Sequence, residues 1–304
     1  MLAPMRPPSP AVPVSARLGR SALAQGAVGR RWLAELPAAV ERVARAWQLE
    51  VGVPLEHSGA AVLLSVRTAA GAPALLKLSL PDEEARHEAE ALRRWNGTGA
   101  VRVLRASDDG FVLLLERCVP GHDLWSVTRD QQVAVLTGLF PRLWVAPTPD
   151  LPVTDLGDTV RRWQREFAAQ GRALGLSCEV ADRAGAWARE LGSDQPSRLL
   201  HGDLHPGNVL RAEREPWLAI DPKPWLGDPA FDLAQLLANW LWAAGETGAD
   251  ARSVHRWAAE LSERLGLEVR RVLGWAAVKA LGWDFDPSTV LVLGAAASSV
   301  WDER

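Results

Sequence analysis

The sequence contains no tyrosine and very little lysine. Lysine occurs only at Lys77, Lys223 and Lys279, so arginine carries nearly all of the positive charge, while tryptophan occurs 15 times. An arginine-rich, lysine-poor composition is typical of a GC-rich coding sequence, and it indicates compositional drift rather than a function. Because lysine is so scarce, however, each of the three lysines is worth inspecting as a candidate functional residue.

Cysteine is also scarce, and no large excess of charge of either sign is present. Cys118 and Cys178 are far apart and lack the close Cys or His spacing of a zinc site, so we expect two free thiols in a reducing cytoplasm. The formal net charge is only −3, from 34 basic and 37 acidic residues. Such a balance gives no strong positive electrostatic potential that would attract nucleic acid. We therefore expect no nucleic-acid partner and a small substrate.

Long hydrophobic runs are missing as well. The apolar run at 290–300 is shorter than the roughly 18 residues that indicate a membrane-spanning helix, and it contains Gly294 and two serines. Residues 1–13 include five prolines and no apolar core of a signal peptide. We therefore expect a flexible leader over residues 1–30 and a soluble, cytoplasmic protein without membrane contact, acting as a monomer.

With 304 residues and 48% hydrophobic content, the chain can form one bilobal unit or two domains. After a predicted amphipathic helix at 33–49, strand-like segments occur at 61–67, 74–80, 101–104 and 111–116, with one charged helix at 82–95. From residue 131 onward the three-and-four apolar spacing predicts helices instead, at 131–143, 156–174, 179–191, 229–243, 251–265, 268–281 and 288–301. The pattern predicts an α+β fold with a small sheet lobe over 31–117 and a larger helical lobe over 118–304.

The segment 199–234 constrains function most tightly. It places Asp203 five residues before Asn208, and Asp221 follows at the end of an apolar run. Phosphoryl transfer requires little covalent participation by a protein, so the residues must position the acceptor hydroxyl, hold metal ions and neutralise phosphate charge. Asp203 is the candidate that orients the hydroxyl and accepts its proton, and Asn208 with Asp221 offers the hard oxygen ligands that Mg²⁺ prefers.

The same segment allows other interpretations. His201, Asp203 and His205 alternate along the chain and could form a metal cluster, although Pro206 and Gly207 interrupt the strand and no third strong ligand is evident. His201 is more simply a structural histidine that hydrogen-bonds the loop backbone.

Two further aspartates follow this loop. We predict that Asp228 orders the loop and that Asp232 caps or anchors the helix that begins at Pro229.

His201, Asp203, Asn208 and Asp221 resemble the catalytic loop and the metal-binding aspartate of the kinase-like aminoglycoside phosphotransferases. Within that family, the phrase from residue 212 to 224 is similar to the streptomycin 6-phosphotransferase and hydroxyurea phosphotransferase branch. The resemblance extends from about residue 33 to the C-terminal helices, and it implies a bilobal protein-kinase-like fold with a nucleotide-binding N-terminal lobe.

In the first lobe the resemblance also implies a set of nucleotide-binding residues. Lys77 would contact the α- and β-phosphates of the nucleotide, and Glu88 would pair with it. Glu116 and Cys118 occupy the position of the hinge that hydrogen-bonds adenine, and Ser58 lies in the phosphate-covering turn. Here the chain has one glycine where the protein-kinase loop has three.

Several of these residues could instead have ordinary structural or surface roles. Lys77 could be an ordinary lysine at a strand edge, and Glu84 or Glu90 could replace Glu88 on a helix whose acidic residues form a solvated face. The sequence Trp283-Asp-Phe-Asp286 pairs aromatic rings with acids, which suits a cationic, hydroxyl-rich ligand but equally suits a turn between helices.

The sequence therefore predicts an ATP- and Mg²⁺-dependent O-phosphotransferase that acts on a small hydroxylated molecule, most simply an aminoglycoside of the streptomycin type. A kinase for another hydroxylated metabolite or antibiotic differs only in the acceptor pocket. A non-catalytic pseudokinase is the third alternative, and the joint presence of Lys77, Asp203, Asn208 and Asp221 argues against it.

Overall fold

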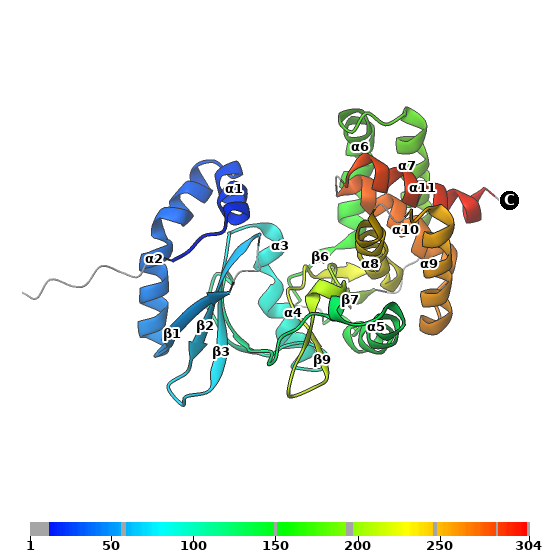
Figure 1. Cartoon of the computed structure of the whole chain (residues 1–304). Helices are drawn as coiled ribbons and strands as arrows, with labels where there is room; N and C mark the ends of the chain where they lie inside the picture. Colours follow the sequence, from blue (N-terminus) through cyan, green and yellow to red (C-terminus); the bar gives the residue numbers. More distant parts are fainter. Residues whose placement is uncertain are drawn as a thin grey trace, which may run out of the picture. The chain divides into compact units, whose positions relative to one another are not determined.

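The computed structural model describes residues 12–55, 59–148, 151–192, 197–245, 248–283 and 285–302. The chain divides into two compact units, which are coloured along the sequence in Figure 1. Unit 1 contains residues 1–96 and 101–117, and unit 2 contains residues 97–100 and 118–304. An antiparallel sheet dominates unit 1 and helices dominate unit 2, so the predicted α+β architecture is confirmed.

The sheet of unit 1 has five strands in the order β1-β2-β3-β5-β4, and all neighbours run antiparallel. The alternating pattern predicted the central strands closely, but it missed the first strand, five of whose six residues are exposed. An edge strand of this kind lacks the buried face on which a sequence pattern depends. The strands are β1 (Glu50–Leu55), β2 (Ala61–Arg67), β3 (Pro73–Ser79), β4 (Val103–Ala106) and β5 (Val112–Glu116).

Helices α1 (Ala16–Ala24) and α2 (Ala27–Trp47) lie on one side of this sheet in Figure 1. Their buried side chains form one core with alternate residues of the central strands. The members of this core are Leu18, Leu36, Val40, Val62, Leu64, Val66, Ala74, Leu76, Leu78 and Leu114.

The structure differs from the predicted flexible leader over residues 16–30, which are helical apart from a short turn. The side chain of Ser15 caps the first helix, and Leu18 is only 1% exposed. A Cβ atom at Gly29 would stand 1.7 Å from the carbonyl oxygen of Ala22, so the two helices meet at a glycine. A helix this short carries too few apolar residues for its periodicity to be recognised without the core that receives it.

The other side of the sheet carries helix α4 (Glu88–Trp95), which follows the single turn α3 (Glu83–Arg86). The sequence predicted one continuous helix here, but the chain breaks at His87. Side chains alternate across a strand, so Lys77 points away from the face on which Leu76 and Leu78 pack. That alternation directs the ammonium group of Lys77 toward α4.

Unit 2 is built around α10 (Val269–Gly282), which packs against five other helices. Ten of its fourteen residues are buried, so this helix occupies the core of the unit. These five helices are α6 (Leu156–Ala173), α7 (Cys178–Leu191), α8 (Pro229–Ala244), α9 (Ala251–Leu265) and α11 (Pro287–Trp301), and α5 (Arg129–Leu143) packs against α9.

Short strands of unit 2 support its polar loops. One sheet has the order β6-β10-β7, from β6 (Thr154–Asp155), β10 (Trp225–Gly227) and β7 (Arg198–Leu200). A hairpin of β8 (Val209–Arg211) and β9 (Trp217–Ala219) follows the turn η2 (Pro206–Asn208). The loop of residues 201–208 thus runs between two fixed strands, and we call it the catalytic loop below.

Two further expectations from the sequence concern membrane-spanning helices and the state of the two cysteines. Within the described ranges, no helix has the length and apolar character needed to cross a membrane. Cys118 and Cys178 are both free thiols, as predicted.

Candidate active site

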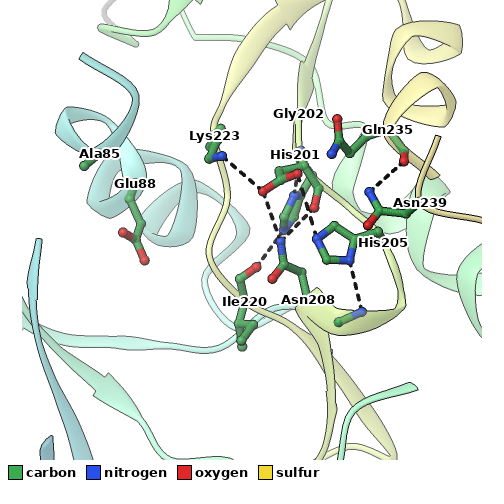
Figure 2. Close-up of polar contacts among 12 residues, drawn as sticks. Ala85, Glu88, His201, Gly202, His205, Asn208, Ile220, Lys223, Gln235 and Asn239 are labelled. Atoms are coloured by element: carbon green, nitrogen blue, oxygen red, sulfur yellow. Dashed lines mark hydrogen bonds and ion pairs between the residues drawn. The ribbon is translucent and has the colours of Figure 1, made fainter. Parts of the chain in front are cut away.

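The catalytic loop bends sharply where the sequence places Pro206 and Gly207. His205 precedes the turn and accepts a hydrogen bond from the Gly207 amide at its Nδ1 atom, at 3.1 Å. Proline at the first position of the turn needs no amide partner, so the chain can reverse there without leaving a buried donor. The bend brings the side chain of Asn208, which is labelled in Figure 2, back to within hydrogen-bond distance of Asp203.

Asp203 is 7% exposed, and its polar neighbours come from the catalytic loop and from the segment that carries Lys223. The Asn208 side-chain amide donates to the Asp203 main-chain oxygen at 2.8 Å and to its carboxylate at 3.3 Å. The Lys223 ammonium lies 3.3 Å from the same carboxylate oxygen, Asp203 Oδ2, that accepts the Asn208 amide, and His205 Nε2 lies 3.9 Å from the other oxygen, Oδ1. The carboxylate is therefore held in one orientation while remaining reachable.

His201 is wholly buried, and both of its ring nitrogens make hydrogen bonds to the backbone. Nε2 lies 3.0 Å from the carbonyl oxygen of Ile220, which can only accept, so this nitrogen carries the proton. Nδ1 accepts the amide of Asp203 at 3.3 Å. His201 thus ties the catalytic loop to the segment that carries Asp221, and its predicted structural role is confirmed.

Burial lowers the pKa of His201 from 6.5 to about 4, so the ring is neutral in the folded protein at neutral pH. Burial lowers the pKa of His205 as well. A neutral His201 agrees with its hydrogen bonds, because a protonated Nδ1 could not accept the Asp203 amide. The loop geometry therefore depends on the uncharged ring.

This shift predicts a loss of stability in acid. Between pH 6.5 and 4 the unfolded chain binds a proton at His201 that the folded chain does not bind, so the free energy of unfolding falls as the pH falls through this window. The expected loss is about 3 kcal/mol across the window. Urea unfolding at several pH values measures it, and the His201→Gln variant, which cannot titrate, should show a shallower pH dependence. An equally steep fall in that variant would contradict the assignment.

Gly202 is held from both sides by buried charges. Asp232, at the start of α8, accepts the amides of His201 at 3.0 Å and Gly202 at 2.6 Å. From α10, the ammonium group of Lys279 donates to the Gly202 carbonyl oxygen at 2.6 Å. The φ angle of Gly202 is +77°, and a Cβ atom there would stand 1.9 Å from the Lys223 carbonyl oxygen. The residue before Asp203 must therefore be glycine.

The predicted roles of Asp228 and Asp232 were wrong and are exchanged in the structure. Asp228 caps α8 by accepting the amide of Ala230 at 3.0 Å, whereas Asp232 orders the catalytic loop. Asp228 also accepts hydrogen bonds from Arg271 and from the indole of Trp275, both on α10. Spacing alone could not separate the two roles, because both aspartates lie within the first turn of the same helix.

Asn208 and Asp221 form the candidate magnesium ligands. The amide nitrogen of Asn208 is engaged by Asp203, which leaves its carbonyl oxygen as the atom that can face a cation. The Ile220 amide donates to the main-chain oxygen of Asn208 at 2.9 Å, so the chain entering Asp221 is attached to the loop. Asp221 has a φ angle of +55°, which aspartate tolerates better than most residues. This oxygen donor set fits Mg²⁺.

The alternative metal cluster of His201, Asp203 and His205 is not supported. Both nitrogens of His201 are used in hydrogen bonds, and His205 Nδ1 caps the turn that follows it. Among the residues that the structure describes, no group of three or more histidine, cysteine, aspartate or glutamate side chains could hold a metal ion.

Unit 1 contains the predicted pair of Lys77 and Glu88. The Lys77 ammonium lies 2.7 Å from Glu88 Oε2, and the two residues are 6% and 1% exposed. A charged pair buried this deeply is costly unless both partners are held, so this is not a surface ion pair. The alternative of a lysine at an exposed strand edge is therefore wrong, and α4 supplies Glu88 rather than Glu90 as the partner.

Glu116 and Cys118, the predicted hinge residues, lie where the chain leaves the sheet. Glu116 ends β5 and its carboxylate accepts the amide of Arg102 at 3.0 Å. Cys118 is half-buried and is the first residue after unit 1 ends at Arg117. Ser58, assigned to the phosphate-covering turn, lies outside the described residues.

All three lysines of the chain are engaged with candidate site residues. Lys77 pairs with Glu88, Lys223 with Asp203, and Lys279 with the Gly202 carbonyl oxygen. The sequence interpretation assigned a role only to the first of them. The scarcity of lysine was the sequence signal that could have identified Lys223 and Lys279 as site residues. Lys279 is 0% exposed, and a lysine is rarely buried so completely without a partner.

The sequence around Trp283 serves mainly as a connection between helices. Asp286 caps α11 by accepting the amide of Thr289 at 3.0 Å. The Trp283 ring lies 4.0 Å from the Lys279 ammonium and 5.4 Å from that of Lys223. Its aromatic face therefore supports two lysines of this chain.

The sequence of this chain is similar to those of known antibiotic resistance kinases. The profile of one protein family, described as aminoglycoside/hydroxyurea antibiotic resistance kinase, matches residues 46–282. Streptomycin 6-kinase of Streptomyces glaucescens is 38% identical over 287 residues, which cover 91% of this chain and 92% of that protein. Hydroxyurea phosphotransferase of Kitasatospora aureofaciens is 39% identical over 259 residues, which cover 82% of this chain and 72% of that protein.

A solved structure supports the fold independently. The GDP complex of a mutant aminoglycoside 2'-phosphotransferase-IIIa matches with a TM-score of 0.55 over 88% of this chain and 99% of that chain. Sequence identity is only 13%, so this likeness bears on the fold alone. The predicted kinase-like fold is confirmed.

Proposed function

The chain belongs to the aminoglycoside/hydroxyurea antibiotic resistance kinase family, and from this premise we propose that it transfers the γ-phosphate of ATP to a hydroxyl group of an aminoglycoside of the streptomycin type. The observation that carries this proposal is the geometry of Asp203, which is fixed by Asn208 and Lys223 while its carboxylate stays reachable. Identity of 38% to a streptomycin 6-kinase over most of both chains supports the choice of acceptor.

Asp203 orients the acceptor hydroxyl and accepts its proton as the oxygen attacks phosphorus. The neighbouring Lys223 ammonium, 3.3 Å from Asp203 Oδ2, neutralises negative charge that gathers on the transferred group. Neither residue forms a covalent bond to the phosphate. The protein instead positions the reacting groups and stabilises charge, which is the main requirement of this reaction.

Asn208 and Asp221 hold Mg²⁺ in this proposal. The ion, when bound, neutralises the phosphate oxygens and fixes their orientation. Asn208 contributes its amide oxygen, since its nitrogen is committed to Asp203. Asp221 contributes a carboxylate from a backbone segment that His201 anchors through Ile220.

In unit 1, Lys77 binds the phosphates of the nucleotide, and Glu88 keeps its ammonium in place through the 2.7 Å contact. Glu116 and Cys118 would offer backbone groups to the adenine base, and Ser58 would lie in the turn over the phosphates. Each of these assignments rests on the family resemblance together with the position of the residue along the chain.

A phosphorylation screen tests the proposed function. The purified protein is incubated with ATP and Mg²⁺ and with streptomycin, other aminoglycosides, hydroxyurea or small hydroxylated amines, and mass spectrometry locates the added phosphate. We expect phosphorylation of streptomycin-type acceptors. Phosphorylation of another class alone would reassign the acceptor, and the absence of any ATP-dependent phosphorylation would favour the pseudokinase alternative.

Asp221→Ala should remove the Mg²⁺ dependence of nucleotide binding, because a neutral methyl group cannot replace a carboxylate ligand. Calorimetry of ATP binding with and without Mg²⁺ measures this effect. The wild type should bind ATP more tightly when Mg²⁺ is present, and the variant should not. Equal magnesium-ATP affinity in both proteins would show that Asp221 is not a ligand.

The proposed reaction is compatible with the expected cytoplasmic location, monomeric state and lack of a nucleic-acid partner. ATP and reduced thiols are both plentiful in the cytoplasm, and the two free cysteines need no oxidising compartment. A monomer suffices for the reaction, since a single chain supplies every residue named above. The small net charge and the small acceptor give no reason to include nucleic acid among its partners.

A further inference from the structure

The proposed reaction uses Asp203 and Asn208 of the catalytic loop but not His205. The imidazole of His205 is mostly buried, with 19% of the side chain exposed, and burial lowers its pKa, so the ring is neutral at neutral pH. Its Nδ1 atom accepts the Gly207 amide at 3.1 Å, and an amide can only donate, so Nδ1 carries no proton. The single proton of the neutral ring therefore lies on Nε2.

Gly207 also fixes the orientation of this ring. A Cβ atom at Gly207 would stand 2.9 Å from Cε1 and 3.2 Å from Nδ1 of His205, so the imidazole packs directly on the backbone of the turn. The absence of a side chain at Gly207 allows this close approach, and the hydrogen bond to Nδ1 holds the ring there. The turn itself therefore sets the direction in which Nε2–H points.

The Nε2–H group has no hydrogen-bond acceptor among the residues that the structure describes. Asp203 Oδ1 is 3.9 Å away, which is beyond hydrogen-bond distance. Nε2 is nevertheless not one of the fully covered polar atoms that lack a partner, so it keeps accessible surface. A small molecule in the site can therefore reach this donor.

The two oxygens of the Asp203 carboxylate are not equivalent. Oδ2 accepts from the Asn208 amide and faces the Lys223 ammonium, both at 3.3 Å, whereas Oδ1 has no donor within hydrogen-bond distance in the described ranges. Oδ1 is thus the oxygen that remains to accept a proton, and Nε2–H of His205 lies beside it. One hydroxyl oxygen, about 2.7 Å from Oδ1 and about 2.9 Å from Nε2, can donate to the first and accept from the second.

We propose that His205 is a catalytic residue, whose Nε2–H donates a hydrogen bond to the oxygen of the acceptor hydroxyl while Asp203 Oδ1 accepts the hydroxyl proton. The inference rests on the proposed function, in which the reacting hydroxyl lies at Asp203. As the oxygen bonds to the γ-phosphorus, its proton passes to Oδ1, and ADP leaves with the electron pair of the broken P–O bond. His205 keeps its proton throughout. Its contribution is orientation, because two fixed hydrogen bonds direct the attacking lone pair.

Two substitutions separate the functions of the two ring nitrogens. His205→Asn keeps an oxygen that can accept the Gly207 amide two residues on, but it has no atom in place of Nε2. We expect kcat/KM for streptomycin to fall about tenfold in this variant, as for the loss of one hydrogen bond, with an unchanged Tm. His205→Gln can place an N–H near the position of Nε2 but leaves the Gly207 amide without its acceptor. This variant should have a lower Tm and retain more of the kcat/KM.

The KM for ATP should stay unchanged in both variants, because His205 does not contact the nucleotide in this proposal. His255→Asn, which replaces a half-buried histidine of α9, is the matched control and should leave the kinetic constants as in the wild type. If His205→Asn fails to fold, Gly207→Ala tests the same donor, since the added methyl group would displace the ring and lower kcat/KM without removing a hydrogen-bonding group.

A purely structural role would give the opposite order. If His205 only capped the turn, His205→Asn would be as active as the wild type and His205→Gln would be the poorer enzyme, and that order would overturn the inference. A rise in the KM for ATP with unchanged constants for streptomycin would also overturn it, because Nε2–H would then serve the nucleotide.

Wild-type activity separates failure of this inference from failure of the proposed function. If the wild type phosphorylates no aminoglycoside, the proposed function fails and the inference falls with it. If the wild type phosphorylates streptomycin and His205→Asn retains its kcat/KM, only the inference fails.

Discussion

Asp203→Asn should lower kcat by about two to four orders of magnitude, the range that general-base catalysis contributes. Asparagine has nearly the shape of aspartate and can still accept from the Asn208 amide, so the loop should keep its conformation. It cannot accept the proton of the acceptor hydroxyl, however. We therefore expect the loss in kcat, measured by coupled ATP consumption with streptomycin, to occur without a comparable loss of stability.

Binding measurements complete this test. ATP affinity and Tm should remain close to those of the wild type, because Asp203 is not placed among the nucleotide ligands. Asp158→Asn is a suitable control, since that carboxylate lies on the surface of α6 with 71% of its side chain exposed. Retention of full activity in Asp203→Asn would contradict the mechanism. A large fall in Tm would instead mean that the carboxylate is needed for folding of the loop.

Much of the candidate site could be predicted because its residues lie close together in the sequence. Asp203 and Asn208 are five residues apart, and a proline and a glycine between them allow the bend that joins them. The pair of Lys77 and Glu88 is separated by eleven residues, and one strand and one helix bring it together. In both cases the contact depends on local geometry, which a sequence pattern can express.

Contacts between distant segments could not be predicted in this way. Lys279 follows Gly202 by 77 residues, and only the packing of α10 in the core of unit 2 brings the two together. The exchange of roles between Asp228 and Asp232 has the same origin, because their partners His201, Arg271 and Trp275 come from other elements. Helix periodicity indicates that a residue is buried but does not identify its partner.

The charges of Asp232 and Lys279, which both contact Gly202, stabilise each other. Asp232 and Lys279 are both 0% exposed, and burial raises the pKa of the Asp232 carboxyl, while its hydrogen bonds and the positive charge of Lys279 lower it. Each charge therefore compensates the other across the two peptide groups that flank Gly202. Since the second of these peptide groups leads into Asp203, stability and catalytic geometry depend on the same contacts.

Lys279→Met should lower the free energy of unfolding by about 3 kcal/mol or more, since removal of one buried charge leaves its counterpart uncompensated. Methionine fills nearly the same volume, so little of this loss arises from a cavity. The Gly202 carbonyl oxygen also loses its donor, so kcat should fall even under conditions in which the variant is folded. Urea unfolding and steady-state kinetics at low temperature measure the two effects.

A double-mutant cycle with Asp232→Asn distinguishes charge compensation from a simple loss of contacts. If the two charges compensate each other, the double variant should be less destabilised than the sum of the single variants, with a coupling of about 1–3 kcal/mol. Arg264→Met is the control for loss of an exposed charge, because its ion pair with Glu260 lies on the surface of α9 and should contribute less than about 1 kcal/mol. Strict additivity in the cycle would show that Asp232 and Lys279 hold Gly202 independently, each through its own hydrogen bond.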